Sequence, residues 1–287
     1  MQINKKIIAI ALVSCIVLSC KKEYSVENGP FDPNNPKIGA NCRLSQIVEV
    51  DSSSGAGFGS LNAYFNANDQ VTRVSTFDSV QGLTIYNADI TYSGDTMRVN
   101  AQEYFILDAS KKAMEFHTFQ DPVDTSSGKI TFVYSYLASG HLAKKEIFVG
   151  GIPIPAVRFT YTWSGDNLTS VEGLVVVPGA EQKLFSAIMT YDNTQTVKNF
   201  IPIFPDGFET VPYIMAINLG LTSRNVLTSL SASNYDNSGN LSQTLTTTFT
   251  GQKFSPDGYL VEWMASGDLP ANSGLPTGLT RFHYHCK

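Results

Sequence analysis

Apolar and polar residues alternate along several stretches of the chain. Between residues 157 and 163 every second side chain is large and apolar, and the side chains between them are arginine or threonine. Residues 281–286 repeat the pattern, with aromatic or cysteine side chains alternating with arginine and histidine. Successive side chains of a strand point to opposite faces of its sheet, so this period of two predicts half-buried strands. The threonine-rich run 244–249 suits a strand with one face in water.

Short polar clusters that contain glycine separate the alternating stretches. They lie at residues 93–95, 139–140, 164–167, 237–240 and 255–258. Such clusters supply the positive φ angles that tight hairpins require. An aromatic residue, a few turn residues and an aliphatic residue recur at intervals of about 28 or 44 residues. This spacing predicts strands of about 9–11 residues, which are typical of a curved sheet or a barrel.

The helices that a parallel sheet needs are missing from the pattern. Only residues 211–221 form an apolar stretch of helical length, and they could be a short helix or an apolar loop. We therefore predict an all-β fold with a single antiparallel β domain at residues 41–287. Its long hairpin strands are expected to form a strongly curved sheet or barrel, with at most one or two short helices.

The first residues predict export from the cytoplasm. Two lysines precede an apolar run at residues 7–18, which is followed by Ser19 and Cys20. This arrangement is typical of a signal peptide, and the run is shorter than the ~20 residues of a membrane-spanning helix. Residues 17–20 resemble the lipobox of bacterial lipoproteins, which implies cleavage after residue 19 and a lipid on Cys20. A second candidate, Cys15, would leave an apolar stretch on the mature protein.

Residues 20–40 are predicted to be a flexible tether. Residues 26–36 hold three prolines, three asparagines and one glycine, a composition that cannot form a core. The charged residues 21–23 resemble the surface-export signals of Bacteroidetes lipoproteins. We therefore expect a protein anchored by lipid in the outer membrane, on its periplasmic or its cell-surface face.

The net charge argues against nucleic-acid binding, and the cysteine content predicts a disulfide. The formal net charge is −5, and loss of the leader with its two lysines makes it −7. An acidic domain with scattered basic residues lacks the basic surface that binds nucleic acid.

Cys42 and Cys286 remain near the two ends of the domain, and in an oxidising compartment they are expected to form a disulfide. The alternative is two free thiols.

The lipobox, the tether and one hairpin together suggest a family. Residues 235–241 read Tyr-Asp-Asn-Ser-Gly-Asn-Leu. With the first two features, this hairpin resembles a Bacteroidetes exported lipoprotein family of unknown function with a porin-like fold. The resemblance implies a barrel-like, soluble shape and carries no functional residues. The chain ends without the C-terminal aromatic residue expected of an outer-membrane barrel, so a membrane pore is not expected.

The chemistry-bearing residues give weak signals. His283 and His285 would share one face of a strand and could begin a zinc site, but Arg281 on the same face disfavours a cation there. We expect exposed polar side chains here, and no metal or cofactor is predicted. Strand carboxylates could support glycoside hydrolysis only if the fold brings two of them together; the candidates are Asp166, Glu172, Asp257 and Glu262. No catalytic motif is present, so we expect a protein that is not an enzyme.

Aromatic residues offer the better functional hint. They could form a platform for sugar rings or fill the core; the six are Tyr134, Tyr136, Tyr161, Trp163, Tyr259 and Trp263. Residues 78–80 and 95–97, Asp-Ser-Val and Asp-Thr-Met, resemble the O-glycosylation motif of exported Bacteroidetes proteins. Our first hypothesis is a lipid-anchored, non-catalytic binding or adhesion protein whose partner is a glycan or another envelope protein. The alternatives are a glycan-binding accessory protein and a hydrolase.

Overall fold

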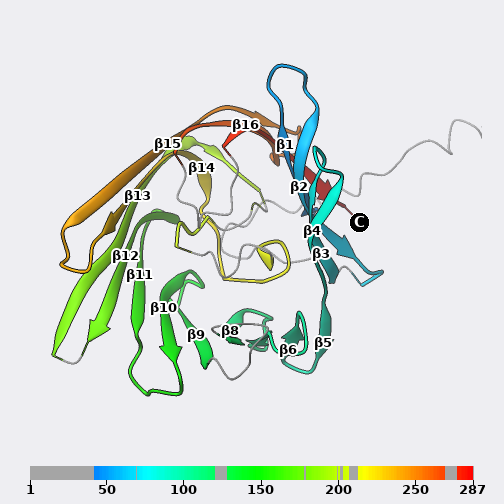
Figure 1. The fold of residues 1–287 in the computed structure, drawn as a ribbon. Helices are drawn as coiled ribbons and strands as arrows, with labels where there is room; N and C mark the ends of the chain where they lie inside the picture. The colour runs from blue at the N-terminus through cyan, green and yellow to red at the C-terminus, as the bar shows by residue number, and fades with distance from the viewer. Residues whose placement is uncertain are drawn as a thin grey trace, which may run out of the picture.

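The computed structural model describes residues 42–68, 70–119, 128–177, 179–198, 200, 203–206, 213–268 and 277–286. The predicted signal peptide and tether lie outside these residues, as does Cys20. All the strands belong to one antiparallel sheet that curves into a barrel-shaped wall (Figure 1). The predicted fold class is therefore confirmed. Among the described residues, no helix has the length and apolar character that a membrane crossing requires.

The sheet has 17 strands. The first nine are β1 (Arg43–Val50), β2 (Gly57–Phe65), β3 (Val71–Asp78), β4 (Leu83–Asp89), β5 (Thr91–Ser93), β6 (Thr96–Arg98), β7 (Tyr104–Leu107), β8 (Ala113–Phe119) and β9 (Lys129–Tyr136). The other eight are β10 (Leu142–Val149), β11 (Val157–Ser164), β12 (Asn167–Val177), β13 (Ala180–Thr196), β14 (Asn225–Tyr235), β15 (Leu241–Phe254), β16 (Leu260–Gly267) and β17 (Gly278–His285).

Almost every strand pairs with its neighbours in the chain, and β1 joins the two ends of the sheet. It pairs with β17 on one edge and with β2 on the other. The exception is the step from β4 to β5, which are separated by one residue, Ile90. Among the described residues, β4 pairs with β3 and β5 pairs with β6, and no pairing joins β4 to β5. The wall is therefore closed except along β4.

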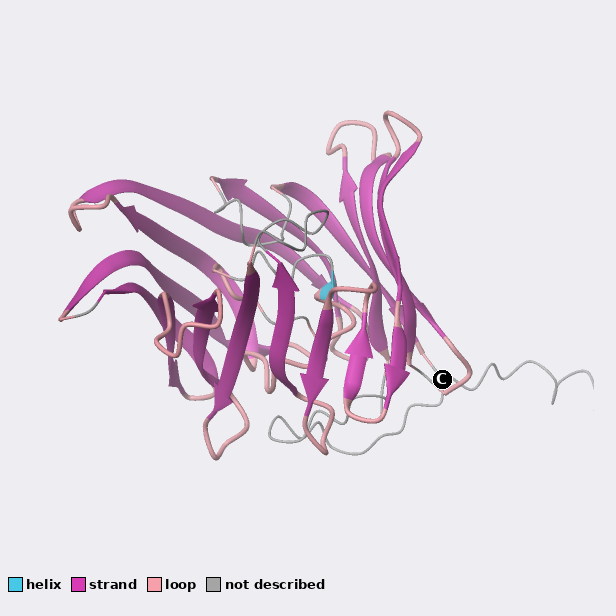
Figure 2. Cartoon of the chain, turned by 60° about the horizontal axis from the view of Figure 1, so that its bottom comes forward, coloured by secondary structure: helices cyan, strands magenta, loops and turns pink. Residues whose placement is uncertain are grey.

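Burial follows the predicted alternation. On β11, Phe159 and Tyr161 are buried while Thr160 and Thr162 are exposed. The strand lengths vary more than predicted, from 3 residues in β5 to 17 in β13. The long strands β12 to β15 extend together on one side of the wall (Figures 1 and 2). The short strands follow from local turn chemistry, because the turn at Gly94 reverses the chain after three paired residues.

The predicted turns are confirmed at all five glycine-bearing clusters. Their glycines have positive φ angles between 55° and 93°; they are Gly94, Gly140, Gly165, Gly239 and Gly258. The apolar stretch 211–221, of which the structure describes 213–221, makes a single helical turn in which the N–H of Ile217 donates to the carbonyl of Tyr213. This stretch is therefore mainly an apolar loop.

The predicted disulfide is confirmed. Cys42 precedes β1 and Cys286 follows β17, and these two strands pair along their length. The Cα atoms of the two cysteines are 4.1 Å apart and their sulfur atoms are bonded. The bond joins the two ends of the described domain across the strand pair that closes the wall.

Loss of this disulfide should lower the stability of the domain. It closes a loop with a sequence separation of 244, for which the chain-entropy model gives an upper value of about 4–5 kcal/mol. We expect the Cys42→Ser/Cys286→Ser variant of the full chain to unfold at a clearly lower denaturant concentration than the oxidised protein. Addition of a thiol reductant should lower the stability of the natural chain and leave the variant unchanged. Equal midpoints for the oxidised protein and the variant would contradict the prediction.

Candidate functional site

The space inside the curved wall is filled by one connection of the chain. The interior segment is the described part of the connection from β13 to β14, residues 197–198, 200, 203–206 and 213–224, and it includes the yellow chain in the middle of Figure 1. Its described apolar side chains are mostly buried: Val197, Phe200, Phe204, Tyr213, Ile214, Met215, Ile217, Leu219 and Leu221. The inner face of the sheet and this segment therefore share one core.

Aromatic contacts fix the interior segment to different parts of the wall. The ring of Phe204 lies 5.2 Å from that of Tyr161 on β11. The ring of Phe200 lies 5.4 Å from the indole of Trp263 on β16. On the other side of the barrel, Tyr213 contacts the aromatic side chains of β7 and β8. Because edge-to-face pairs of this kind are favourable beyond their area burial, the segment is held from several directions.

One close backbone approach requires a glycine. Gly220 has a φ of +87°, and a Cβ atom there would lie 2.3 Å from the carbonyl oxygen of Gly140. The next residue, Leu221, donates its N–H to that same oxygen over 3.1 Å. The interior segment thus meets the turn between β9 and β10 backbone to backbone.

A buried ion pair also joins the segment to the wall. Lys145 on β10 places its Nζ 2.7 Å from Oδ2 of Asp206, and the two side chains are only 2% and 1% exposed. The same Nζ donates to the main-chain carbonyl of Asp206 over 3.0 Å. The hydroxyl of Tyr161 donates to Oδ2 over 2.6 Å. Two charges so deeply buried are stable only as a hydrogen-bonded pair, so this contact fixes one position of the segment.

A second polar contact crosses the interior. Tyr86 on β4 donates its hydroxyl hydrogen to the hydroxyl oxygen of Tyr213 over 2.6 Å, and Tyr213 donates to Oε2 of Glu103 over 3.0 Å. Burial raises the pKa of both tyrosines above its ordinary value. Both hydroxyls therefore remain neutral donors, and their role is to position the segment.

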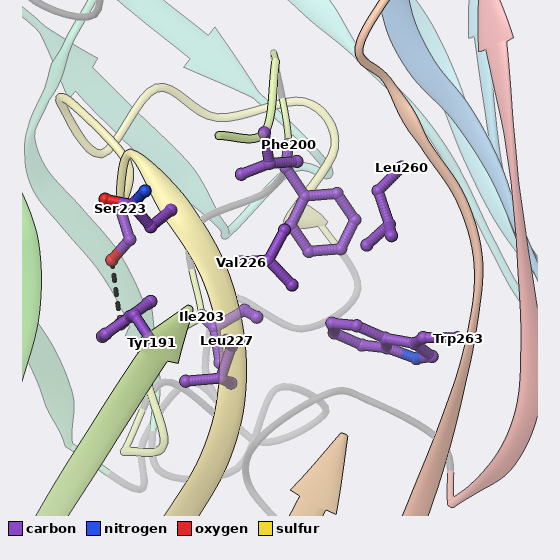
Figure 3. A pocket seen from close by; sticks show the side chains of 10 residues that line it. Tyr191, Phe200, Ile203, Ser223, Val226, Leu227, Leu260 and Trp263 are labelled. Carbon is purple, nitrogen blue, oxygen red and sulfur yellow. Dashed lines mark hydrogen bonds between the residues drawn. The ribbon is translucent and has the colours of Figure 1, made fainter. Parts of the chain in front are cut away.

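A small cavity lies between β13, β14, β16 and the interior segment (Figure 3). Its apolar side includes Phe200, Leu260 and Trp263, and its polar side includes Tyr191 and Ser223. The space holds about one water molecule. It is therefore too small for an organic ligand, which needs several hundred Å³.

The polar groups of this cavity are occupied by one another. The hydroxyls of Tyr191 and Ser223 are 2.9 Å apart, and the Tyr191 hydroxyl donates to the carbonyl of Leu168 over 2.9 Å. The N–H of Leu168 donates to Oγ of Ser223 over 3.1 Å. Burial raises the pKa of Tyr191 to about 12. These contacts anchor the end of the interior segment to β12 and β13.

The structure places most of the predicted aromatic platform in the core. Four of its six residues are buried: Tyr134, Tyr161, Tyr259 and Trp263. The other two, Tyr136 and Trp163, are partly buried and pack against the same core. Trp163 donates its indole N–H to the carbonyl of Leu142 over 2.7 Å, and the hydroxyl of Tyr136 donates to the carbonyl of Ala113. Only these two keep part of their surface in solvent.

The candidate carboxylates lie on β12, on β16 and in the turns before these two strands, and the two histidines lie on β17. Glu262 forms ion pairs with Lys253 and Arg281. These two cations hold the pKa of its carboxyl below the usual range. Of the other candidates, Glu172 and Asp166 each have one cationic partner, Lys183 and Arg224 respectively. His283 is exposed, whereas the ring of His285 stacks on Phe65.

A feature that sequence reasoning missed lies on the outside. The β1–β2 and β3–β4 hairpins project beyond the rest of the wall, where they are blue and cyan in Figure 1. Half of the large apolar side chains that the described residues expose belong to residues 58–85; they are Phe58, Tyr64, Phe77, Val80, Leu83 and Ile85. We call the region formed by residues 48–60 and 76–89 the projecting hairpins. The candidate glycosylation residue Ser79 lies here and donates its hydroxyl hydrogen to the carbonyl of Gly57 over 2.6 Å.

The buried ion pair generates a stability prediction. Substitution Lys145→Met leaves the Asp206 carboxylate buried beside an apolar side chain, so we expect the free energy of unfolding to fall by about 3–5 kcal/mol. The double variant Lys145→Met/Asp206→Leu should be more stable than the single variant. Lys144→Met is a matched control, because the partly exposed pair of Lys144 with Glu146 should contribute about 1 kcal/mol or less. Equal denaturation midpoints for the Lys144 and Lys145 variants would contradict this account.

Comparisons with known proteins point to one fold. No protein-family model matches the chain, and no curated protein matches its sequence. Among solved structures, a porin-like protein from Bacteroides uniformis ATCC 8492 is similar, with a TM-score of 0.56 and 16% identity over 84% of this chain and 98% of the other. A porin-like protein from Bacteroides vulgatus ATCC 8482 gives a TM-score of 0.53 and 12% identity over 85% and 99%. This protein thus shares its barrel-shaped, all-β fold with porin-like proteins of Bacteroides.

Proposed function

We propose that this protein is a non-catalytic binding or adhesion protein of the cell envelope, attached to the outer membrane by a lipid on Cys20. The observation that carries the proposal is the filled interior. The interior segment occupies the inside of the wall with buried side chains and ion-paired Lys145 and Asp206. Among the described residues, protein side chains take up this space, which favours a ligand site on the outer surfaces and the turns. The projecting hairpins carry five of the twelve large apolar side chains that the described residues expose.

The location is supported by two independent features. The lipobox at residues 17–20 and the proline- and asparagine-rich residues that follow suit a tethered lipoprotein. The disulfide between Cys42 and Cys286 suits an oxidising compartment outside the cytoplasm. Several acyl chains on one cysteine would give stable attachment, since each buried CH₂ contributes roughly 0.8 kcal/mol.

The two alternative functions have less support. A glycan platform would need two exposed, coplanar aromatic rings, and of the six candidates only Trp163 and Tyr136 keep part of their surface in solvent. Both use their polar atoms in bonds to the protein itself. A hydrolase would need two carboxylates free for acid and base roles, whereas Glu262 and Glu172 are engaged by cationic side chains.

The lipid anchor can be tested directly in the full-length chain. In a bacterial host grown with an alkyne-tagged palmitate, the natural protein should incorporate the label and sediment with the outer membrane. Cys20→Ala should lose both the label and the membrane fraction. Cys15→Ala is the matched control and should retain both. Label that persists in Cys20→Ala and is lost in Cys15→Ala would assign the lipid to Cys15. A natural protein that incorporates no label would overturn the lipid anchor.

A further inference from the structure

The projecting hairpins leave one edge of the sheet open. β4 pairs with β3 along one edge. The strand that could cover its other edge, β6, is only three residues long and pairs with β5 instead. Among the described residues, no strand pairs with the second edge of β4. An open edge carries N–H and C=O groups that can pair with another extended chain.

The register shows which backbone groups face this open edge. The N–H of Ile90 donates to the carbonyl of Thr72 on β3 over 2.7 Å. In an antiparallel strand, backbone groups point alternately to one edge and the other. Two and four residues back from Ile90, Ala88 and Tyr86 therefore face β3. Asn87 and Asp89 direct their N–H and C=O groups to the open edge.

Apolar side chains accompany the open edge. Leu83 and Ile85 on β4 are 56% and 69% exposed, and Val80 in the adjoining turn is 80% exposed. Phe77 on the paired strand β3 and Phe58 on the next strand, β2, are also exposed. Natural proteins usually protect an edge strand with charged residues, prolines or a covering element. Here exposed apolar residues sit beside it, which is typical of an interaction site.

The charge of this region is strongly one-sided. Residues 44–97 contain six acidic residues and a single basic one, Arg73, whereas the rest of the chain has 19 of each. The guanidinium of Arg73 lies over the ring of Tyr64, 4.2 Å from its centroid. This segment, which forms most of β1 to β5 and their turns, therefore contributes −5 of the net charge of −7 that remains after loss of the leader. Such a surface attracts a basic partner and repels an acidic one.

Two of the acids lie on one row across the hairpins. Glu49 on β1 and Asp78 on β3 both stand opposite Gly59 on β2. Because Gly59 has no side chain, the Glu49 carboxylate lies over it. Burial and the Asp78 carboxylate raise the pKa of Glu49. A cationic side chain placed beside these two carboxylates would relieve their repulsion.

We infer that the open edge of β4 binds an extended segment of a partner protein, in which apolar residues alternate with lysine or arginine. The partner adds a strand to the sheet through the outward backbone groups of Asn87 and Asp89. Its apolar side chains pack on those of β4, and its basic side chains face the acidic residues of the projecting hairpins. This inference names the partner class for the binding function proposed above and therefore rests on it.

The same charges disfavour two other occupants. A second copy of the chain paired β4 to β4 would place two acidic segments side by side, and like charges facing each other are destabilising. An anionic membrane surface would be repelled in the same way. A partner segment with alternating apolar and basic residues suits both the exposed apolar side chains beside the open edge and the acidic residues around it.

The test uses the purified full-length protein in detergent and a fluorescent ten-residue peptide of alternating valine and lysine. Binding is measured by fluorescence anisotropy at low salt. We expect saturable binding that weakens as salt increases. A peptide with the same residues in two blocks, and one with glutamate in place of lysine, should each bind at least about tenfold more weakly.

Variants locate the site. Asn87→Pro removes an outward N–H without touching the β3–β4 hydrogen bonds, which an edge strand tolerates, and should weaken binding about tenfold or more. Asn87→Ala keeps the N–H and should bind as the natural chain does. Ile85→Ser should weaken binding, whereas Ile188→Ser, at an equally exposed position on β13 (63%), should not. Asp89→Pro replaces Asn87→Pro if thermal unfolding shows that the latter is destabilised.

The outcomes are distinct. The inference is overturned by equal binding of the alternating and block peptides, by natural affinity in the proline variants, or by no binding at all. A dimer that light scattering detects in the natural chain and not in Asn87→Pro would overturn it in favour of a second copy. Palmitate labelling of the same preparation reports on the anchor separately. A labelled protein that does not bind the peptide overturns the partner alone, and an unlabelled one that binds it overturns the anchor alone.

Discussion

A single sheet that curls through 17 strands cannot bury its own inner face, because the two sides of the wall stand too far apart for their side chains to meet. Most of the structure depends on how that space is filled. Here the interior segment supplies a second layer of apolar side chains, and the rings of Phe200, Phe204 and Tyr213 reach different parts of the wall. Burial of polar backbone inside a barrel is costly unless each group finds a partner. Contacts such as Leu221 to Gly140 and Lys145 to Asp206 provide such partners.

Because the interior is occupied by the protein's own side chains, we expect the protein to function through its outer surface. Interior polar groups that would suggest chemistry in another setting, such as Tyr191 with Ser223 or Lys145 with Asp206, are occupied by each other and hold the interior segment in place. On the outer surface, in contrast, the projecting hairpins combine exposed apolar side chains with four acidic residues and no basic one. The disulfide fastens β1 to β17, which leaves the β1–β2 hairpin on a fixed base.

The sequence predicted the elements that depend on local pattern. Alternation in residues 157–163 and 281–286 identified β11 and β17, and the glycine clusters identified the turns. The pairing of Cys42 with Cys286 followed from their being the two cysteines left in an exported domain. The interior segment was not predicted, because its apolar stretch at 211–221 has neither a strand nor a helix period. Its destination depends on contacts with residues far away in the chain.

The open edge of β4 could not be predicted from local sequence patterns either. Nothing in residues 83–89 shows that β6 ends after three residues, because strand ends are set by a turn outside that segment. The charge asymmetry, however, is visible in the sequence, since a count of charges by segment finds one base among residues 44–97 and so marks this region as acidic.

The role of the aromatic residues, in contrast, could not be read from the sequence. Trp263 and Tyr134 suit a platform or a core equally well by residue type, and only their burial in the folded chain distinguishes the two roles.

Hydrogen exchange of the full-length protein tests the filled interior most directly. Peptides that cover residues 213–224 are followed by mass spectrometry beside peptides from the central strands β11 to β14. If the interior segment is part of the core, its hydrogen-bonded amides, among them those of Ile217 and Leu221, will exchange as slowly as those of the strands. Exchange of this segment at the rate of an exposed loop, while the strands remain protected, would show an open lumen and contradict the account.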